Sequence, residues 1–362
     1  MKGRKGDAQR RLTELLASLD RGIYTSPGKL TVAEHLGNWL DGYVKTNCSQ
    51  RTLDGYQSIV EHHLIPALGH ILLKQLTLQT IQAYYGKACQ KLSTRTVHHQ
   101  HRVLSEALKY AVRQGYLARS VCELVAAPKP QKKAMRTLTP EELETLLETA
   151  TENHFYPVIY TAVSTGLRQA ELLGLRWRDV DFDFKSILVS RTLYKRRGVY
   201  EFKEPKRAHS RRRVNMTPKL AAYLKEYKAE RESLLLHLGR LPRPDDLVFA
   251  SVEGKPLDPG MLSHNFGRIV KRAGLENVRF HDLRHTFASL MLLRGARSKV
   301  ISEALGHSSV AFTMDVYSHI IEGMQQDAMR LLDGDLPKAK NGAYGKNNAK
   351  LTPPLDIKST SG

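Results

Sequence analysis

The chain has 362 residues, and its 56 Lys and Arg against 36 Asp and Glu give a formal net charge of +20. This length exceeds one ordinary core and predicts about two domains, while 41% hydrophobic residues suffice for globular folding. The positive charge favours a polyanionic partner, with nucleic acid the leading candidate.

The cysteine pattern excludes two classes of small stabilised fold. Cys48, Cys89 and Cys122 are too few and too scattered for a disulfide framework or a zinc site. They are expected to be small buried side chains in a reducing compartment. No apolar signal segment follows the basic N-terminus, and no apolar run has the length of a membrane span. The sequence therefore predicts a soluble, cytoplasmic protein.

The first part of the chain has helical periodicity. Residues 1–29 are predicted to form one amphipathic helix, at 7–19, and a linker. Residues 30–128 predict a bundle of four helices with short links, followed by a shorter turn. The residues expected to cap these four helices are Thr31, Ser49 or Thr52, Thr77 and Ser93.

Basic side chains of this bundle are predicted to point outward. They form either a solvated surface or a surface that binds phosphate groups, and the net charge supports the second interpretation. The residues proposed to contact DNA are Lys45, Arg51, Lys87, Arg95 and Arg102. His98, His99 and His101 lack the spacing of metal ligands, so they are predicted to be surface or DNA-facing groups.

A basic segment that contains Pro130, residues 129–138, is the predicted interdomain linker. Thr139 then begins a capping box with Pro at the first helical position, which opens a second domain over 139–332. A helix at 157–164 is expected next. Arg168 follows it at the start of another helix, where a cation is poorly stabilised unless an anion joins it. Arg168 is therefore a candidate phosphate ligand.

From Ser186 the apolar period changes to two, which predicts strands. Two strands around a turn at 195–198 and a third through 212–216 predict a small antiparallel sheet. Lys206 lies in its second turn, either as a solvated lysine or as a cation that reaches a bound strand. The remaining expected elements are a helix capped by Thr217-Pro218, a variable leucine- and charge-rich segment to about Leu241, a short strand at 247–250, helices at 259–272 and 320–332, and a disordered tail over 333–362.

His281 and Arg284 stand three residues apart, so on a helix they project from the same face. A second histidine and a tyrosine follow downstream. A histidine, an arginine, another histidine and a tyrosine could act together on a phosphate. The full set of candidates, in chain order, is Arg168, Lys206, His281, Arg284, His307 and Tyr317.

This set resembles the tyrosine recombinase (phage integrase) family, and the resemblance covers residues 30–332. The matching segments are Thr165-Gly166-Leu167-Arg168 with Glu171, Pro205-Lys206, His281-Asp282-Leu283-Arg284-His285-Thr286, Leu305-Gly306-His307 and Val316-Tyr317-Ser318-His319. The resemblance implies a mainly α protein. An N-terminal helical core-binding (SAM-like) bundle would precede an α+β catalytic domain with a small antiparallel sheet.

The family implies site-specific recombination, in which DNA is cut and rejoined through a 3′-phosphotyrosyl link without a metal or an energy cofactor. By this resemblance Tyr317 is the nucleophile, His281 the general base and Lys206 the acid for the departing 5′-oxygen. Arg168 and Arg284 would grip the equatorial phosphate oxygens with guanidinium forks that lysine cannot copy.

The resemblance also implies the role of His307, the remaining catalytic residue, and of two supporting residues. His307 would hydrogen-bond the scissile phosphate, and Glu171 and His285 would support the main groups.

Partners also follow from the resemblance. The protein is expected to be a monomer when free and a homotetramer on attachment-site DNA, with a directionality factor or a host DNA-bending factor. The helix at 320–332 either packs onto a neighbouring protomer or closes its own domain. Many relatives have an N-terminal arm-binding domain, a small sheet followed by a helix. Residues 1–29 are then a remnant of that domain, or the chain starts downstream of the true beginning.

Three other functions are less consistent with this sequence. DNA relaxation by a type IB topoisomerase uses similar chemistry, but the two-domain layout favours recombination. A catalytically inactive DNA-binding accessory protein would have no use for Tyr317. A metal nuclease is disfavoured because the sequence contains no carboxylate cluster that could hold Mg²⁺.

Overall fold

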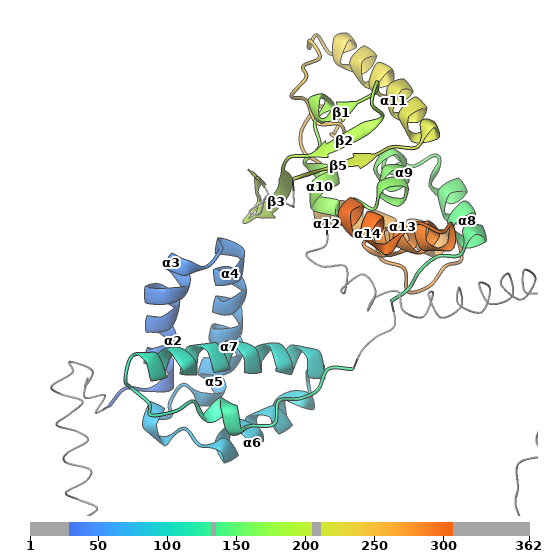
Figure 1. Cartoon of the computed structure of the whole chain (residues 1–362). Helices are drawn as coiled ribbons and strands as arrows, with labels where there is room; N and C mark the ends of the chain where they lie inside the picture. The colour runs from blue at the N-terminus through green and yellow to red at the C-terminus, as the bar shows by residue number, and fades with distance from the viewer. Residues whose placement is uncertain (1–28, 132–134, 205–210, 307–362) are drawn as a thin grey trace, which may run out of the picture. The chain divides into compact units, whose positions relative to one another are not determined.

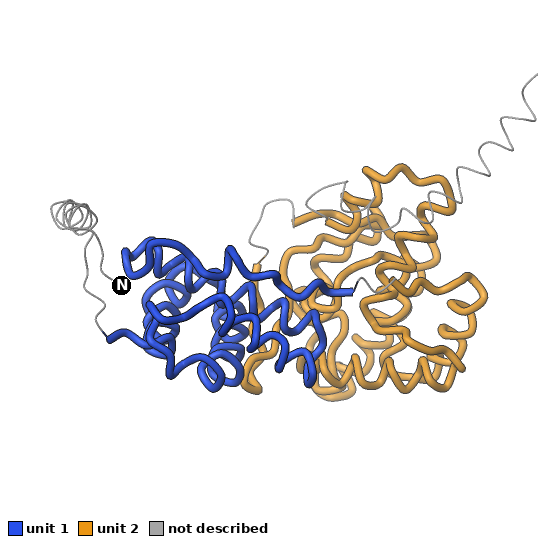
Figure 2. The backbone as a smooth tube through the Cα atoms, turned by 90° about the horizontal axis from the view of Figure 1, so that it is seen from below, with its two compact units in different colours: residues 1–133 blue, residues 134–362 orange. Residues whose placement is uncertain are grey.

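The structure is a computed structural model that describes residues 29–131, 135–204 and 211–306. The chain divides into two compact units, Met1–Lys133 and Ala134–Gly362 (Figure 2). Among the described helices, none combines the length and the apolar character that crossing a bilayer requires. The helices predicted at 7–19 and 320–332 and the predicted tail lie outside the described residues.

Unit 1 is helical in its described part (Figure 1). Its helices begin where the sequence predicts, because Thr31, Ser49, Thr77 and Ser93 each accept a hydrogen bond from the backbone N–H three residues on. The first two helices each continue through a π-helical turn. The elements are α2 (Val32–Trp39), η1 (Leu40–Val44), α3 (Lys45–Asn47), α4 (Gln50–Ile59), η2 (Val60–Leu64), α5 (Ile65–Leu68), η3 (Leu73–Gln75), α6 (Leu78–Cys89), α7 (Thr94–Arg113) and η4 (Val121–Leu124).

The apolar stripes of these helices meet in one core. Leu36 and Trp39 of α2 are buried together with Tyr85 of α6 and Leu104 of α7. The Trp39 ring stacks on Tyr56 with 5.5 Å between ring centroids. Burial of such large aromatic side chains supplies much of the hydrophobic stabilisation of a small unit.

Unit 2 combines helices with short strands. It opens, as predicted, with the Thr139 capping box. Three elements were not predicted: the short 3-10 helix at 177–179, the strand at 180–181 and the helix at 298–305. The elements are α8 (Pro140–Ala150), α9 (Tyr156–Thr165), α10 (Gln169–Leu173), η5 (Trp177–Asp179), β1 (Val180–Asp181), β2 (Ser186–Val189), β3 (Thr192–Arg196), β4 (Val199–Lys203), β5 (Arg212–Asn215), α11 (Pro218–His237), α12 (Pro259–Arg272), α13 (Asp282–Leu293) and α14 (Ser298–Leu305).

The strands form two antiparallel sheets instead of the single sheet predicted. β1, β2 and β5 form one sheet, with Ile187 of β2 opposite Val214 of β5, and β3 and β4 form a separate hairpin. The hairpin turn is Arg197-Gly198, in which both residues have positive φ, as a two-residue type I′ turn requires. The strand predicted at 247–250 is wrong, because its ends make only isolated bridges, Leu247 with Arg176 and Ala250 with Pro256.

The core of unit 2 brings the site-bearing helices together. Helix α13 packs against α9 and α14, and α14 in turn contacts β5 (Figure 1). Leu283 on the inner face of α13 is fully buried in the same apolar cluster as Ile159 of α9 and Ile187 of β2. The ends of α9 and α14 and the start of α10 are thereby held next to the inner face of α13.

Gly166 ends α9 in a left-handed conformation, with φ +65°. A Cβ atom at this position would lie 2.5 Å from Cδ1 of Phe287 and 2.7 Å from Cδ2 of Leu305. Both the backbone conformation and the close packing of α13 and α14 therefore require glycine here.

We predict that Gly166→Ala lowers the free energy of unfolding by at least about 2 kcal/mol, because strain and overpacking add at one position. Urea denaturation followed by circular dichroism measures this loss. The matched control is Gly267→Ala on an open face of α12, where nothing lies within 4 Å of the added carbon. The control variant should gain about 0.5–1 kcal/mol. Equal stability of the two variants would contradict the analysis.

Candidate active site

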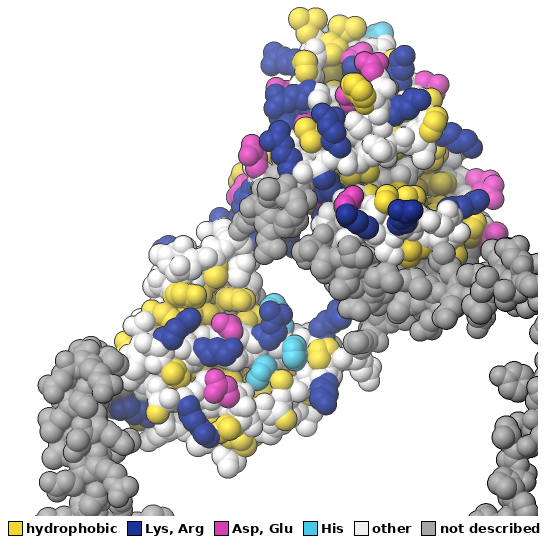
Figure 3. Space-filling model, in the orientation of Figure 1, with side chains coloured by type: hydrophobic (Ala, Val, Ile, Leu, Met, Phe, Trp, Pro, Cys, Tyr) yellow, Lys and Arg dark blue, Asp and Glu magenta, His cyan; other side chains and the backbone are white. Residues whose placement is uncertain are grey.

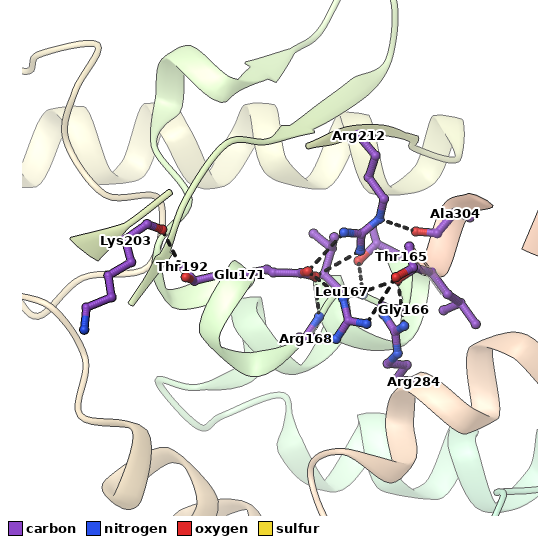
Figure 4. A network of polar contacts seen from close by, with 12 residues as sticks. Thr165, Gly166, Leu167, Arg168, Glu171, Thr192, Lys203, Arg212, Arg284 and Ala304 are labelled. Atoms are coloured by element: carbon purple, nitrogen blue, oxygen red, sulfur yellow. Dashed lines mark hydrogen bonds and ion pairs between the residues drawn. The ribbon is translucent and has the colours of Figure 1, made fainter. Parts of the chain in front are cut away.

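Arg284 lies in the first turn of α13, and its side chain is turned into the protein. The residue is 3% exposed. Its Nη1 donates to the carbonyl oxygen of Gly166 at 2.7 Å, and its Nη2 donates to that of Leu305 at 2.7 Å (Figure 4). Two carbonyl groups, from the ends of α9 and α14, thus fix the plane of the guanidinium group.

Arg168, at the start of α10, approaches one of these two carbonyl groups, that of Leu305. It occupies the N-cap of that helix, and its side chain is 40% exposed. Its Nη2 donates to Gly306 O at 3.3 Å, and its Nη1 lies 3.5 Å from Leu305 O. Because Arg284 also donates to Leu305 O, the two guanidinium groups are neighbours. The structure therefore brings together two arginines that stand far apart in the sequence.

Glu171 supplies an anion at the start of α10. Its carboxylate accepts hydrogen bonds from the backbone N and the Nη1 of Arg168, both at 2.9 Å, in a capping-box arrangement. Burial by itself would raise the pKa of Glu171, but the hydrogen bonds and charge of Arg212, with the charge of Arg168, outweigh it and lower the pKa. The anion expected at this helix start is therefore provided by the protein itself.

Arg212 is a residue of this network that the sequence analysis missed. It lies on β5, and its Nη1 and Nη2 each donate to a different oxygen of Glu171 at 3.0 Å. Its Nε donates to the carbonyl oxygen of Ala304 at 2.7 Å. The only sequence signal was an arginine at an inward position of a strand, in alternation with the buried Val214.

His281 and His285 lie one helical turn apart at the start of α13, with 5.1 Å between their ring centroids. Desolvation, followed by the charge of Arg284, lowers the pKa of His281, although its side chain reaches the surface. Desolvation, followed by His281, lowers the pKa of His285 to about 4. Both rings are therefore neutral near pH 7.

The network holds three guanidinium groups and one carboxylate, so positive charge is in excess (Figure 4). Asp282, the one carboxylate of α13, is buried and is paired with Arg279. Over the described ranges, no cluster of His, Cys, Asp or Glu has the makings of a metal site. This arrangement is suited to an anion with several oxygens, such as a phosphodiester.

The predicted catalytic set is described in part. Arg168 and Arg284 converge, while His281 lies at the start of α13 within electrostatic reach of both. The predicted supporting residues Glu171 and His285 lie in the same region. Lys206, His307 and Tyr317 lie outside the described residues.

The basic residues predicted to contact DNA are exposed in unit 1, and Figure 3 shows Lys and Arg side chains spread over its visible face. They are Lys45, Arg51, Lys87, Arg95 and Arg102. Of the three histidines predicted at the surface, His99 is exposed, whereas His98 and His101 are half-buried. His98 lies with Nδ1 3.0 Å from Pro128 O, and His101 with Nδ1 2.8 Å from the Tyr85 hydroxyl.

Comparison with protein families identifies the class. The sequence model of the phage integrase family matches residues 136–323, and that of the phage integrase N-terminal SAM-like domain matches residues 31–88. The chain therefore belongs to the phage integrase family. It is a site-specific recombinase of the tyrosine type, an enzyme of the integrase class, with the mainly α fold that the sequence predicts.

Individual relatives agree with this assignment. A tyrosine recombinase XerC-like protein of Caldanaerobacter subterraneus subsp. tengcongensis is 28% identical, over 91% of this chain and 89% of its own length. The ICEBs1 integrase of Bacillus subtilis is 30% identical over 67% of this chain and 66% of its own. Among solved structures, the Tn1549 transposon integrase in complex with transposon right end DNA has the same fold, with TM-score 0.72, 23% identity and coverage of 84% of this chain and 100% of that one.

The lowered pKa of His285 predicts a pH-dependent stability. Its folded pKa of about 4 lies below the ordinary value of 6.5, so the unfolded chain binds the proton first as the pH falls. The contribution is complete above pH 6.5 and is lost from there toward pH 4. We expect a loss of about 2 kcal/mol in the free energy of unfolding between pH 7.5 and pH 5.

Urea titrations at the two pH values test this. His285→Gln should lack about 2 kcal/mol of the wild-type pH dependence, whereas His264→Gln, which replaces an exposed histidine of α12, should retain it. A His285→Gln variant with the full wild-type pH dependence would show that another group is responsible.

Proposed function

We propose that Arg168 and Arg284 bind the non-bridging oxygens of the phosphodiester that this recombinase cleaves in double-stranded DNA. The observation that carries the proposal is the convergence of both guanidinium groups on the Leu305 carbonyl oxygen. A phosphodiester under attack gains negative charge on its equatorial oxygens, and fixed guanidinium forks stabilise that charge. Loss of either arginine should cost roughly 10²–10³ in rate, by analogy with oxyanion donors.

For the covalent step we propose the residues that the family resemblance implies. The Tyr317 oxygen attacks phosphorus, the bond from phosphorus to the 5′-oxygen breaks, and a 3′-phosphotyrosyl link and a 5′-hydroxyl are formed. His281 accepts the phenolic proton, and its lowered pKa supports this role because a base must be neutral. Lys206 protonates the departing 5′-oxygen, and His307 donates a hydrogen bond to the phosphate.

The link keeps the energy of the phosphodiester bond, so a 5′-hydroxyl can reverse the step without ATP. Attack by the hydroxyl of a partner duplex exchanges strands, and a mobile element is integrated or excised. A homotetramer on attachment-site DNA would perform this exchange. A solved lambda integrase tetramer bound to a Holliday junction supports that assembly.

We propose that unit 1 provides a second DNA-binding surface. Its segment 30–128 would bind core-site DNA, and 139–332 would carry the catalysis. The exposed positions of Lys45, Arg51, Lys87, Arg95 and Arg102 support contacts with the phosphate backbone.

We predict that a nicked suicide substrate traps a covalent protein–DNA adduct in the presence of EDTA. The substrate carries the attachment sequence read from the DNA junctions of the integrated element. Denaturing gel electrophoresis measures the adduct. Tyr317→Phe should abolish it while DNA binding persists, because only the nucleophilic oxygen is removed. Absence of an adduct with the wild-type protein would overturn the proposed chemistry.

A further inference from the structure

Arg212 is a buried arginine that the chemistry proposed above does not use. In β5 the side chains alternate, so that Arg212 and Val214 are buried whereas Arg213 and Asn215 are exposed. The Arg212 side chain is 7% exposed, against 40% for Arg168. A cation this far from water needs a partner of opposite charge, and the identity of that partner indicates what the residue does.

The partner is Glu171, which both arginines share. Arg212 binds it with two parallel hydrogen bonds, from Nη1 and Nη2 to the two carboxylate oxygens, both at 3.0 Å. Arg168 uses only one guanidinium nitrogen, Nη1, on one of those oxygens, at 2.9 Å. Figure 4 shows the carboxylate between the two guanidinium groups. The bidentate, charge-neutralising partner of Glu171 is therefore Arg212.

The pairing of Glu171 with Arg212 affects how the Arg168 side chain is oriented. Its remaining terminal nitrogen lies against the Gly306 carbonyl oxygen, a neutral group, at 3.3 Å. If Glu171 had Arg168 as its sole cationic partner in the network, the two would form the bidentate pair themselves. Arg168 would then turn away from the Leu305 and Gly306 carbonyl oxygens, and its charge would be cancelled by a buried anion.

We propose that Arg212 is a positioning residue of the recombination reaction. It neutralises Glu171, so that this carboxylate holds Arg168 in place without cancelling the charge that Arg168 presents to the scissile phosphate. The inference rests on the proposed role of Arg168. It differs from a purely structural role, in which Arg212 would only anchor the end of α14 through the Ala304 carbonyl oxygen.

A double-mutant cycle separates the two roles. The rate constant of adduct formation on the suicide substrate is measured at saturating protein for the wild type, Arg212→Met, Glu171→Gln and the double variant. Removing Arg212 from the wild type should slow cleavage by up to roughly 10²-fold, as for a lost oxyanion donor. In the Glu171→Gln background no carboxylate remains to be neutralised, so Arg212→Met should change the rate by no more than about twofold.

Arg213→Met is the matched control. Arg213 is the next residue of β5, its side chain is 60% exposed, and its Nη1 donates to the Ser186 hydroxyl at 3.2 Å. This variant should cleave at the wild-type rate. Thermal unfolding of each variant gives the folded fraction by which rates are normalised. If Arg212→Met does not fold, the comparison of Glu171→Gln with the double variant decides, since neither leaves a buried carboxylate unpaired.

An equal loss of rate on removing Arg212 in both backgrounds would overturn the inference and leave only the structural role. A wild-type protein that forms no adduct would instead contradict the proposed function. In that case the affinity for inorganic vanadate, followed by vanadium NMR, tests the inference by itself. Arg212→Met should weaken vanadate binding when Glu171 is present and leave it unchanged in the Glu171→Gln background. Unchanged affinity in the first case, or weakened affinity in the second, would refute the inference.

Discussion

The carbonyl oxygen of Leu305 is the atom on which the candidate active site depends, because two arginines from different helices both approach it. Arg284 donates to it at 2.7 Å, and Nη1 of Arg168 lies at 3.5 Å. Two guanidinium groups repel one another, so the fold must hold them together by other means. Backbone carbonyl dipoles contribute to this without adding a negative charge, and Glu171 adds one carboxylate, so the site keeps the net positive charge that the proposed binding of a phosphodiester requires.

These carbonyl groups are available because two helices end there in left-handed glycines. Gly166 has φ +65° and Gly306 has φ +64°, and each closes its helix and turns the chain. An added Cβ would clash with Phe287 and Leu305 at the first glycine and would press on Arg212, at 3.0 Å, at the second. The backbone geometry and the charge network therefore constrain one another, and recombination would depend on both.

Features of the fold that depend on contacts within one turn could be predicted from the sequence. The starts of five helices could be predicted because each capping side chain forms its hydrogen bond within its own turn. These caps are Thr31, Ser49, Thr77, Ser93 and Thr139. Helix α14 was missed because its N-cap, Arg297, makes no side-chain cap bond. The break between the two sheets was missed because strand pairing depends on residues distant in the chain: β2 pairs with β1 and β5, whereas β3 pairs with β4. The role of Arg212 likewise depends on pairing with Glu171, 41 residues away in the chain.

The central claim is that Arg168 and Arg284 stabilise negative charge on the scissile phosphate. Its most direct test compares single-turnover cleavage of two substrates, one with the natural phosphate and one with an uncharged methylphosphonate at the scissile position. Arg168→Ala should slow cleavage of the phosphate by roughly 10²–10³-fold. On the methylphosphonate its effect should be much smaller, because the charge to be neutralised has been removed. An equal loss on both substrates would contradict the account.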